Sequence, residues 1–319
     1  MVAAVVLAAV AAAGLVLLTD PFGDDDSTGP STTGATVDAG PLVVALAGRP
    51  SAIAAGHGFL WVADDERGVV QRLRQEDGSP VGEPIAVSPT PRALAIGADV
   101  VWVADVDGTV TRLDPVSGAV VGPPIALGGA LVDIVADGAT AWVGDIEAGT
   151  VRSVDAGTGT LGDPIVVPDG VVRLAVAGER LWVTGLEASV TPIDLATGTV
   201  GAAVPVGTGP IGMAVVDDVL WVANSDDRTV SRLRADDGSA VGPAVAVGPA
   251  PVALVVDGDD VWVLDQDGPT LTRLARADGR SVADPVLLPM RPRALVATPA
   301  GIWVVGVDPP SAARITPQG

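Results

Sequence analysis

Short apolar runs alternate with turn residues along most of the chain, and the same arrangement returns about every 40 residues. One such unit contains residues 92–97 (RALAIG), 101–105 (VWVAD), 109–114 (TVTRLD) and 123–129 (PPIALGG). Segments of this length, rich in Val, Ile, Leu and Thr and separated by Gly, Asp and Pro, are typical of β-strands. The pattern predicts four strands per unit, with no helical periodicity downstream of the first 20 residues.

A tryptophan marks the second segment of every unit. The seven positions are Trp61, Trp102, Trp142, Trp182, Trp221, Trp262 and Trp303. Four strands repeated seven times predict an all-β, seven-bladed β-propeller with four-stranded blades. Each Trp is expected to fill the space between adjacent blades, where small Ala and Val side chains leave room. The alternative, a ring of ligand-stacking aromatics, requires side chains that face the central channel, and a mid-strand position between Val residues favours packing.

Prolines provide a second periodic signal, 22 or 23 residues after each of the first six Trp. They are Pro84, Pro124, Pro164, Pro205, Pro243 and Pro285. Because proline cannot donate to a strand ladder, this segment is expected to be the outermost strand of each blade. After Trp303 the sequence has room for only one more strand, near residues 312–316. The missing outer strand is expected at residues 41–48, so the N-terminal strand should close the last blade.

The first segment is strongly apolar. Residues 2–18 carry no charge, and about 17 apolar residues are at the short end of what spans a bilayer. A cleaved signal peptide is the alternative, but no basic residue precedes the run and no small-residue cleavage site follows it. We expect a single transmembrane helix over residues 1–19, a flexible linker over 20–40 and the propeller over 41–319. The acidic flank predicts an extracytoplasmic propeller on a single-pass membrane protein.

Composition narrows the possible partners and chemistry. The 319 residues have a formal net charge of -21, and all 18 basic residues are Arg. Such an acidic chain repels phosphate backbones, so no nucleic acid partner is expected. There is no Cys and only one His, which excludes disulfides, a thiolate nucleophile and Cys metal ligands. No cofactor and no metal site are predicted.

Acidic residues recur five positions after every Trp. These predicted rim residues are Glu66, Asp107, Glu147, Glu187, Asp226, Asp267 and Asp308. Asp64, Asp105, Asp145 and Asp265 stand three positions after their Trp, and Asn224 takes that place in a fifth unit. Asp favours hairpin turns because its carboxylate caps backbone amides, and this is the favoured interpretation. The alternative is an acidic crown that attracts cations such as calcium.

Two sets of arginines also recur. Arg92, Arg173 and Arg293 stand at the start of predicted inner strands, nine or ten positions before Trp, in only three of the seven units. Three guanidinium groups at the channel mouth are candidate ligands for a carboxylate or phosphate, unless they merely pair with the rim acids. The second set follows Trp by 10 or 11 positions and is expected to lie opposite it across a hairpin, as a structural contact. Its members are Arg72, Arg112, Arg232, Arg273 and Arg314.

The unit P-x-A-L-A-I-G…V-W-V-A-D…T-V-T-R-L-D-P-V-S-G…V-G-P-P-I-A-L (residues 91–127) resembles the YVTN-type propeller repeats, including relatives of the virginiamycin B lyase family. The resemblance covers nearly all of residues 41–319. It implies the propeller fold, and for the lyases a His- and Glu-based metal site at the channel mouth. The only imidazole, His57, is predicted in a turn on the opposite face. The chain is also similar to the extracytoplasmic sensor propellers of membrane receptor kinases, although it contains no kinase motif.

Three functions are compatible with these observations. We expect a non-catalytic sensor or binding propeller, tethered to the membrane, that meets an envelope ligand or protein partner; the chain is predicted not to be an enzyme, because no nucleophile–base or metal-ligand set is present. A lyase-like or hydrolytic enzyme that uses mouth carboxylates is the alternative. A purely structural scaffold is the third. Fold alone does not decide among them.

Overall fold

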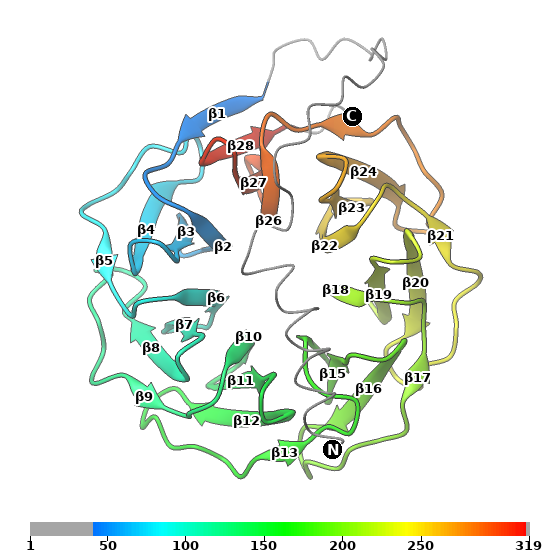
Figure 1. The fold of residues 1–319 in the computed structure, drawn as a ribbon, viewed down its shortest axis with the longest axis horizontal. Helices are drawn as coiled ribbons and strands as arrows, with labels where there is room; N and C mark the ends of the chain where they lie inside the picture. The colour runs from blue at the N-terminus through cyan, green and yellow to red at the C-terminus, as the bar shows by residue number, and fades with distance from the viewer. Residues whose placement is uncertain (1–40, 317–319) are drawn as a thin grey trace. The chain divides into compact units, whose positions relative to one another are not determined.

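A computed structural model describes residues 41–316, which form seven four-stranded antiparallel sheets arranged around a common axis (Figure 1). In six sheets the strands follow chain order, so each sheet is one blade. The seven-bladed, four-stranded prediction is therefore confirmed. The transmembrane helix predicted over residues 1–19 and the linker over 20–40 lie outside the described residues. Within the described part of the chain, no helix has the length and apolarity needed to cross a bilayer.

Each blade runs from an inner strand at the axis to a short outer strand at the periphery. The inner strands are β2 (Pro50–Gly56), β6 (Pro91–Ile96), β10 (Leu131–Asp137), β14 (Arg173–Ala177), β18 (Pro210–Val216), β22 (Pro251–Asp257) and β26 (Arg291–Thr298). The second strands are β3 (Phe59–Asp64), β7 (Val101–Asp105), β11 (Thr140–Asp145), β15 (Arg180–Thr184), β19 (Val219–Asn224), β23 (Asp260–Asp265) and β27 (Gly301–Val307).

The third strands are β4 (Val69–Arg74), β8 (Thr109–Leu113), β12 (Thr150–Asp155), β16 (Ser189–Asp194), β20 (Thr229–Arg234), β24 (Thr270–Ala275) and β28 (Ser311–Ile315). The outer strands are β5 (Ile85–Ala86), β9 (Ile125–Ala126), β13 (Ile165–Val166), β17 (Val204–Pro205), β21 (Val245–Ala246), β25 (Val286–Leu287) and β1 (Leu42–Ala45). The recurring prolines lie within or just before the outer strands, as expected for residues that lack a backbone donor.

The two ends of the propeller meet in the seventh blade. Its strand order is β1-β28-β27-β26, and Leu42 pairs with Arg314 while Ala45 pairs with Ser311. The predicted closure by the N-terminal strand is confirmed. In Figure 1 the blue β1 lies beside the red β28. The first and last strands of the propeller are thus held by the same kind of backbone ladder as the strands of the other blades.

The tryptophans pack between blades, as predicted. Each of the seven buried clusters contains one Trp together with apolar residues of the following blade. The Trp303 ring of blade seven contacts Leu60 and Val62 of blade one, and its Nε1 donates to the carbonyl of Gln75 at 2.9 Å. Trp182 donates to Ala235 of the next blade at 3.2 Å. The alternative of ligand-stacking aromatics is wrong because all seven rings are buried.

Glycine in the turns makes this packing possible. Gly78 follows β4 with a φ of 68° and faces the Trp303 ring. A Cβ at Gly78 would lie 2.7 Å from ring atom Cη2 of Trp303, which is too close for any side chain. A positive φ is accessible to Gly at little cost, so this residue satisfies both requirements.

The arginines of the second set lie directly opposite their tryptophans in the strand register, as predicted. Arg72 pairs with Trp61, and the same relation holds for Arg112, Arg232, Arg273 and Arg314. The Arg72 guanidinium stacks 5.6 Å from the Trp61 ring centroid and donates to the carbonyl of Val116 in the next blade at 2.8 Å. Arg112 donates likewise to Ala156 at 2.9 Å. Arg72 and Arg112 thus link neighbouring blades.

Candidate functional site

One end of the axis carries the start of every inner strand, and we call this end the mouth. The loops between second and third strands lie at the same end, because their backbone amides bond to residues that precede the inner strands. Asp65 donates to the carbonyl of Arg49 at 3.1 Å, and Gln266 donates to Ala250 at 3.0 Å. His57 lies in the turn between β2 and β3, at the opposite end, and its ring bonds to the Gly97 carbonyl at 3.0 Å. The expected placement of His57 away from the mouth is confirmed.

Six inner strands have a bulge near their start, and each bulge leaves one extra residue at the mouth. The register shifts between Pro91 and Ala93 in β6 and between Pro292 and Ala294 in β26, leaving Arg92 and Arg293 as the extra residues. In β2 the extra residue is Ser51. Blades seven, one and two are neighbours around the ring, so these three polar residues form one continuous sector. β-bulges commonly redirect a side chain next to a functional site.

Arg92 interacts electrostatically with residues two blades away. The pKa of Arg92 is lowered to about 10, chiefly by burial and then by the positive charges of Arg173 and Arg293, while Asp65 and Asp133 act in the opposite direction. Arg173 and Arg293 belong to the blades two steps away on either side, so both act on the charge of Arg92 from around the axis. The structure therefore brings together the three arginines singled out in the sequence.

The three arginines are not equivalent in depth. Arg92 and Arg293 occupy bulge positions, whereas Arg173 pairs with Thr184 in the regular part of β14, one residue farther along the inner strand. Arg173 Nη1 donates to the carbonyl of Val172 at 2.9 Å, which fixes the guanidinium near the strand. Within residues 41–316, neither Arg92 nor Arg173 forms an ion pair. Simple pairing with the rim acids does not account for these two arginines.

Asp133 is a charged residue of the inner strands that the sequence analysis did not identify. It lies on β10, between the strands that carry Arg92 and Arg173, and it pairs with Gly144 at the same depth as Arg173 pairs with Thr184. Its Oδ2 accepts a hydrogen bond from the Leu174 amide at 2.7 Å. Burial raises the pKa of Asp133, and Arg173, two backbone amides and Arg92 partly offset that rise. An alignment of the seven repeat units would have revealed Asp133, because four of the other six units have Ala at the equivalent position.

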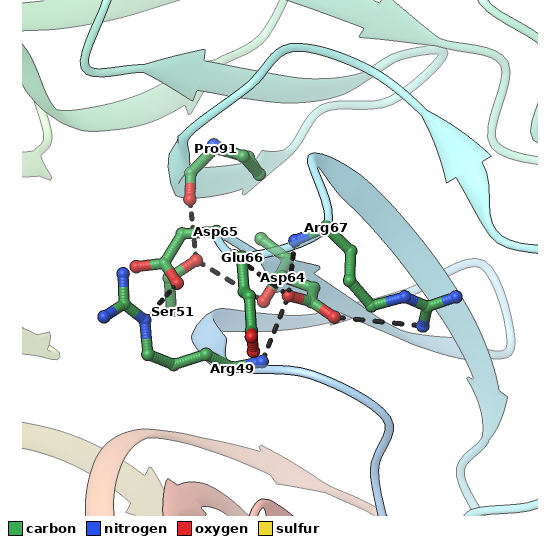
Figure 2. Close-up of polar contacts among 8 residues, drawn as sticks. Arg49, Ser51, Asp64, Asp65, Glu66, Arg67 and Pro91 are labelled. Carbon is green, nitrogen blue, oxygen red and sulfur yellow. Dashed lines mark hydrogen bonds and ion pairs between the residues drawn. The ribbon is translucent and has the colours of Figure 1, made fainter.

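Figure 2 shows the part of the mouth that blade one contributes. The Arg49 Nε atom lies 2.6 Å from Asp65 Oδ1, and Asp65 is the acid that interacts with Arg92. Ser51 donates its hydroxyl to the Pro91 carbonyl at 2.7 Å and so joins the inner strands of blades one and two. Asp65 is thereby paired with Arg49 of its own blade rather than with Arg92.

The recurring acids belong to the turns. Asp64 Oδ1 accepts the amides of Arg49, Glu66 and Arg67, each at 3.1 Å (Figure 2). Asp145 accepts three amides in the same way. The seven acids five positions after Trp are all exposed. No group of three His, Cys or acidic residues suited to a metal ion occurs within the part of the chain that the structure describes. The turn interpretation is confirmed for Asp64, Asp105 and Asp145, which cap the amides of their own loops.

Comparison with known proteins identifies the fold. No protein-family model matches the sequence, and no curated protein matches it. The structure is similar to virginiamycin B lyase from Staphylococcus aureus, with 15% identity, a TM-score of 0.73 and coverage of 88% of this chain and 99% of that chain. A catalytically inactive variant of that lyase with quinupristin gives a TM-score of 0.76 at 15% identity, with the same coverage. A streptogramin B lyase gives 0.73 at 14% identity, covering 86% of this chain and 96% of that chain.

These comparisons contradict the prediction that the chain is not an enzyme. Three of the similar propellers are lyases. The propeller fold by itself therefore does not exclude catalysis. The similarity to a receptor-kinase sensor stays a prediction. The resemblance to the lyase-type propellers is confirmed at the level of the fold, and the chain is a seven-bladed β-propeller whose architecture is similar to that of the virginiamycin B and streptogramin B lyases.

Proposed function

We propose that this propeller binds a small anionic ligand at its mouth, through Arg92, Arg173 and Arg293. The observation that carries the proposal is the convergence of three guanidinium groups from blades two, four and seven on one axis, in a chain whose net charge is -21. Guanidinium groups bind carboxylate and phosphate oxygens in a bidentate manner, and partial burial strengthens such bonds. Mutual repulsion among three like charges is relieved when an anion binds between them.

The test compares two triple variants with the same change in charge. Arg92→Gln/Arg173→Gln/Arg293→Gln removes the mouth charges, while Arg74→Gln/Arg234→Gln/Arg280→Gln removes three exposed charges elsewhere. Titration calorimetry with inorganic phosphate, acetate and citrate should show binding that weakens with salt in the wild type and in the control. It should be lost in the mouth variant. Equal affinities for the two triple variants would disprove the proposal.

Asp133 supports a second candidate function, a lyase that acts on a carboxylate-bearing substrate. A carboxyl whose pKa is raised by burial, beside two guanidinium groups, is suited to accept a proton from a bound substrate. Arg92 and Arg173 would hold the substrate carboxylate, and Asp133 would accept a proton from the adjacent carbon. The C–H electron pair would form a double bond as the leaving group departs with its own bonding pair. Asp133→Asn should then abolish turnover and preserve anion binding.

We also propose that the propeller binds its ligand outside the cytoplasm. The uncharged run at residues 2–18 and the acidic residues after it support a propeller tethered outside the cytoplasm, where the partner is an envelope ligand or protein. The net charge disfavours nucleic acid. Protease accessibility of the propeller in intact cells, compared with lysed cells, tests this placement. Protection in intact cells followed by digestion after lysis would place the propeller inside.

A further inference from the structure

The residues equivalent to Arg92 divide the mouth into two chemically different sectors. At this position blades seven, one and two carry Arg293, Ser51 and Arg92, all polar. The four remaining blades, three to six, carry only aliphatic side chains. These are Val132, Val172, Ile211 and Val252. Around the ring, three consecutive polar residues are therefore followed by four consecutive apolar residues.

The aliphatic residues are partly exposed, although they lie on the innermost strands. All four are only half-buried. An inner strand is covered by neighbouring blades on both faces and by its second strand along one edge, so its remaining exposure faces the axis. The exposed apolar surface of Val132, Val172, Ile211 and Val252 therefore lies on the same axis as the arginines.

A second layer extends the apolar sector toward solvent. Four positions after Trp, where blade one carries Asp65, blades two, three and four carry Val106, Ile146 and Leu186, all half-buried. The amide of Ile146 bonds to the Ala130 carbonyl at 3.0 Å and that of Leu186 to the Asp169 carbonyl at 2.8 Å, which places both residues beside the start of their inner strands. Blades three and four are thus apolar at two successive levels of the mouth.

The polar and apolar sectors lie on opposite sides of the axis. In Figure 1, β26, β2 and β6 occupy adjoining positions on one side, and β18 lies across the ring from them. An inorganic anion or a compact polycarboxylate would meet the arginines but leave the aliphatic residues exposed to water. A molecule with a charged group at one end and an apolar body satisfies both sectors.

We infer that the ligand class of this mouth is an amphiphilic monoanion, with a single carboxylate or phosphate head held by Arg92 and Arg293 and an aliphatic body against Val132, Val172, Ile211 and Leu186. The inference rests on the proposed anion site and specifies its ligand. Each methylene that leaves water against this surface should tighten binding roughly two- to fourfold. Arg173 and Asp133, one residue deeper along their strands, form the polar floor beneath the apolar sector.

A homologous series of soluble carboxylates tests the inference. Affinities of acetate, butyrate, hexanoate and octanoate are measured by calorimetry, together with inorganic phosphate and the uncharged octanamide. The expected result is a steady gain with chain length, weak binding of phosphate and weak binding of octanamide. Anionic phosphatidylglycerol vesicles serve as a second arm, in a sedimentation assay. Binding to vesicles without binding to soluble octanoate would overturn the inference of a free ligand.

Isosteric variants locate the apolar contact. Val132→Thr/Val172→Thr should reduce octanoate affinity by about tenfold and leave phosphate affinity unchanged, since each contact loses apolar area but keeps its shape. The matched control is Val121→Thr/Val166→Thr, which changes exposed residues away from the mouth and should bind octanoate like the wild type.

The possible failures are distinguishable. Anion affinity that does not depend on chain length overturns the amphiphile and leaves the anion site in place. Octanamide that binds as tightly as octanoate, or octanoate binding that survives Arg92→Gln/Arg293→Gln, overturns the anion site itself. Loss of octanoate binding in the control pair would show that the contact is not at the mouth and would overturn the inference.

Discussion

Asn224 and Asp265 occupy equivalent positions at the ends of β19 and β23, and each contacts two hydroxyls of the following strand. Asn224 Nδ2 donates to Thr229 Oγ1 at 3.0 Å and to Ser231 Oγ at 2.9 Å. Asp265 Oδ2 accepts from Thr270 Oγ1 at 3.1 Å and from Thr272 Oγ1 at 2.7 Å. At the same position, one blade thus uses a neutral amide and the other a carboxyl to bond two hydroxyls of the following strand. Burial raises the pKa of Asp265 to about 6 from 3.8.

The first prediction is that Asp265→Asn stabilises the protein at neutral pH. Because the folded-state pKa of Asp265 lies above its unfolded value, the folded state binds more protons between about pH 4 and pH 6. Wild-type stability should therefore fall as pH rises through this window, by an amount on the order of 2–3 kcal/mol. The variant should lose this dependence. Urea denaturation at pH 4.5 and pH 7.5 measures both effects.

Asp105→Asn is the matched comparison and should act in the opposite direction. Asp105 accepts the amides of Thr90 at 2.9 Å and of Asp107 at 2.7 Å, so its charge is stabilised by donors that Asp265 lacks. Replacing it should destabilise the protein at pH 7.5 by about 1–2 kcal/mol. If both Asn variants shift stability in the same direction, local hydrogen bonding does not explain the difference between the two carboxyls.

The second prediction concerns ring closure. Val44 of β1 contacts the cluster that contains Trp303, whereas Val43 is 46% exposed. Val44→Asn should cost about 1–3 kcal/mol, because it removes apolar burial and places an amide beside the core. Val43→Asn should cost less than about 0.5 kcal/mol. Removal of residues 41–48 should be far more damaging than either substitution. Similar melting temperatures for all three variants would show that β1 does not close the propeller.

The third prediction concerns the inter-blade tryptophans. Trp142 packs on Val183 and Ile193 of the next blade. Trp142→Ala should cost roughly 3–5 kcal/mol, as large-to-small core substitutions do, and Trp142→Phe should cost less because it retains most of the buried area. Chemical denaturation measures both. A fully stable Ala variant would mean that neighbouring blades do not depend on this ring.

The fourth prediction concerns the arginine opposite Trp61. Arg72 stacks 5.1 Å from the Phe59 ring centroid as well as on Trp61, and it bonds to the Val116 carbonyl. Arg72→Met should cost about 1–3 kcal/mol, since a charged hydrogen bond and a cation–π contact are lost. A double-mutant cycle with Phe59→Leu should give a coupling energy of about 0.5–1 kcal/mol. Additive effects in the cycle would rule out the stacking contribution.

Repetition explains why so much of the fold was predictable. The period of the tryptophans fixed blade number and strand content, and the position of the prolines placed the outer strands. The phase of the repeat required a strand from residues 41–48 to complete the last blade, and β1 pairs with β28 as that phase demands. Arginines opposite tryptophans follow from hairpin register, which is local. The anchor at residues 1–19 lies outside the described residues and stays a prediction.

The site was only partly predictable, because its chemistry arises where the repeat is broken. Arg92, Arg173 and Arg293 stood out as departures from the pattern, and they do converge. Asp133 did not stand out, since acids are abundant in this chain and its raised pKa comes from burial against β14, which no local sequence window reports. The bulges that separate the depths of Arg92 and Arg173 are also tertiary features. The prediction about enzymes rested on the absence of a familiar catalytic set, and the similarity of the fold to that of lyases contradicts it.

Pairing between β1 and β28 also constrains how the protein is made. Leu42 emerges from the ribosome before any other paired residue of the propeller, and its partner Arg314 emerges among the last. The outer strand of blade seven, β1, is thus synthesised first and stays unpaired until the six other blades and the rest of blade seven have been made. Contacts of such high sequence separation form slowly and leave an exposed edge in the meantime. Before closure, β1 and β28 each have an unpaired edge that can bond to a strand of another molecule. Correct folding therefore requires that β1 pairs with β28 of its own chain before such intermolecular pairing occurs.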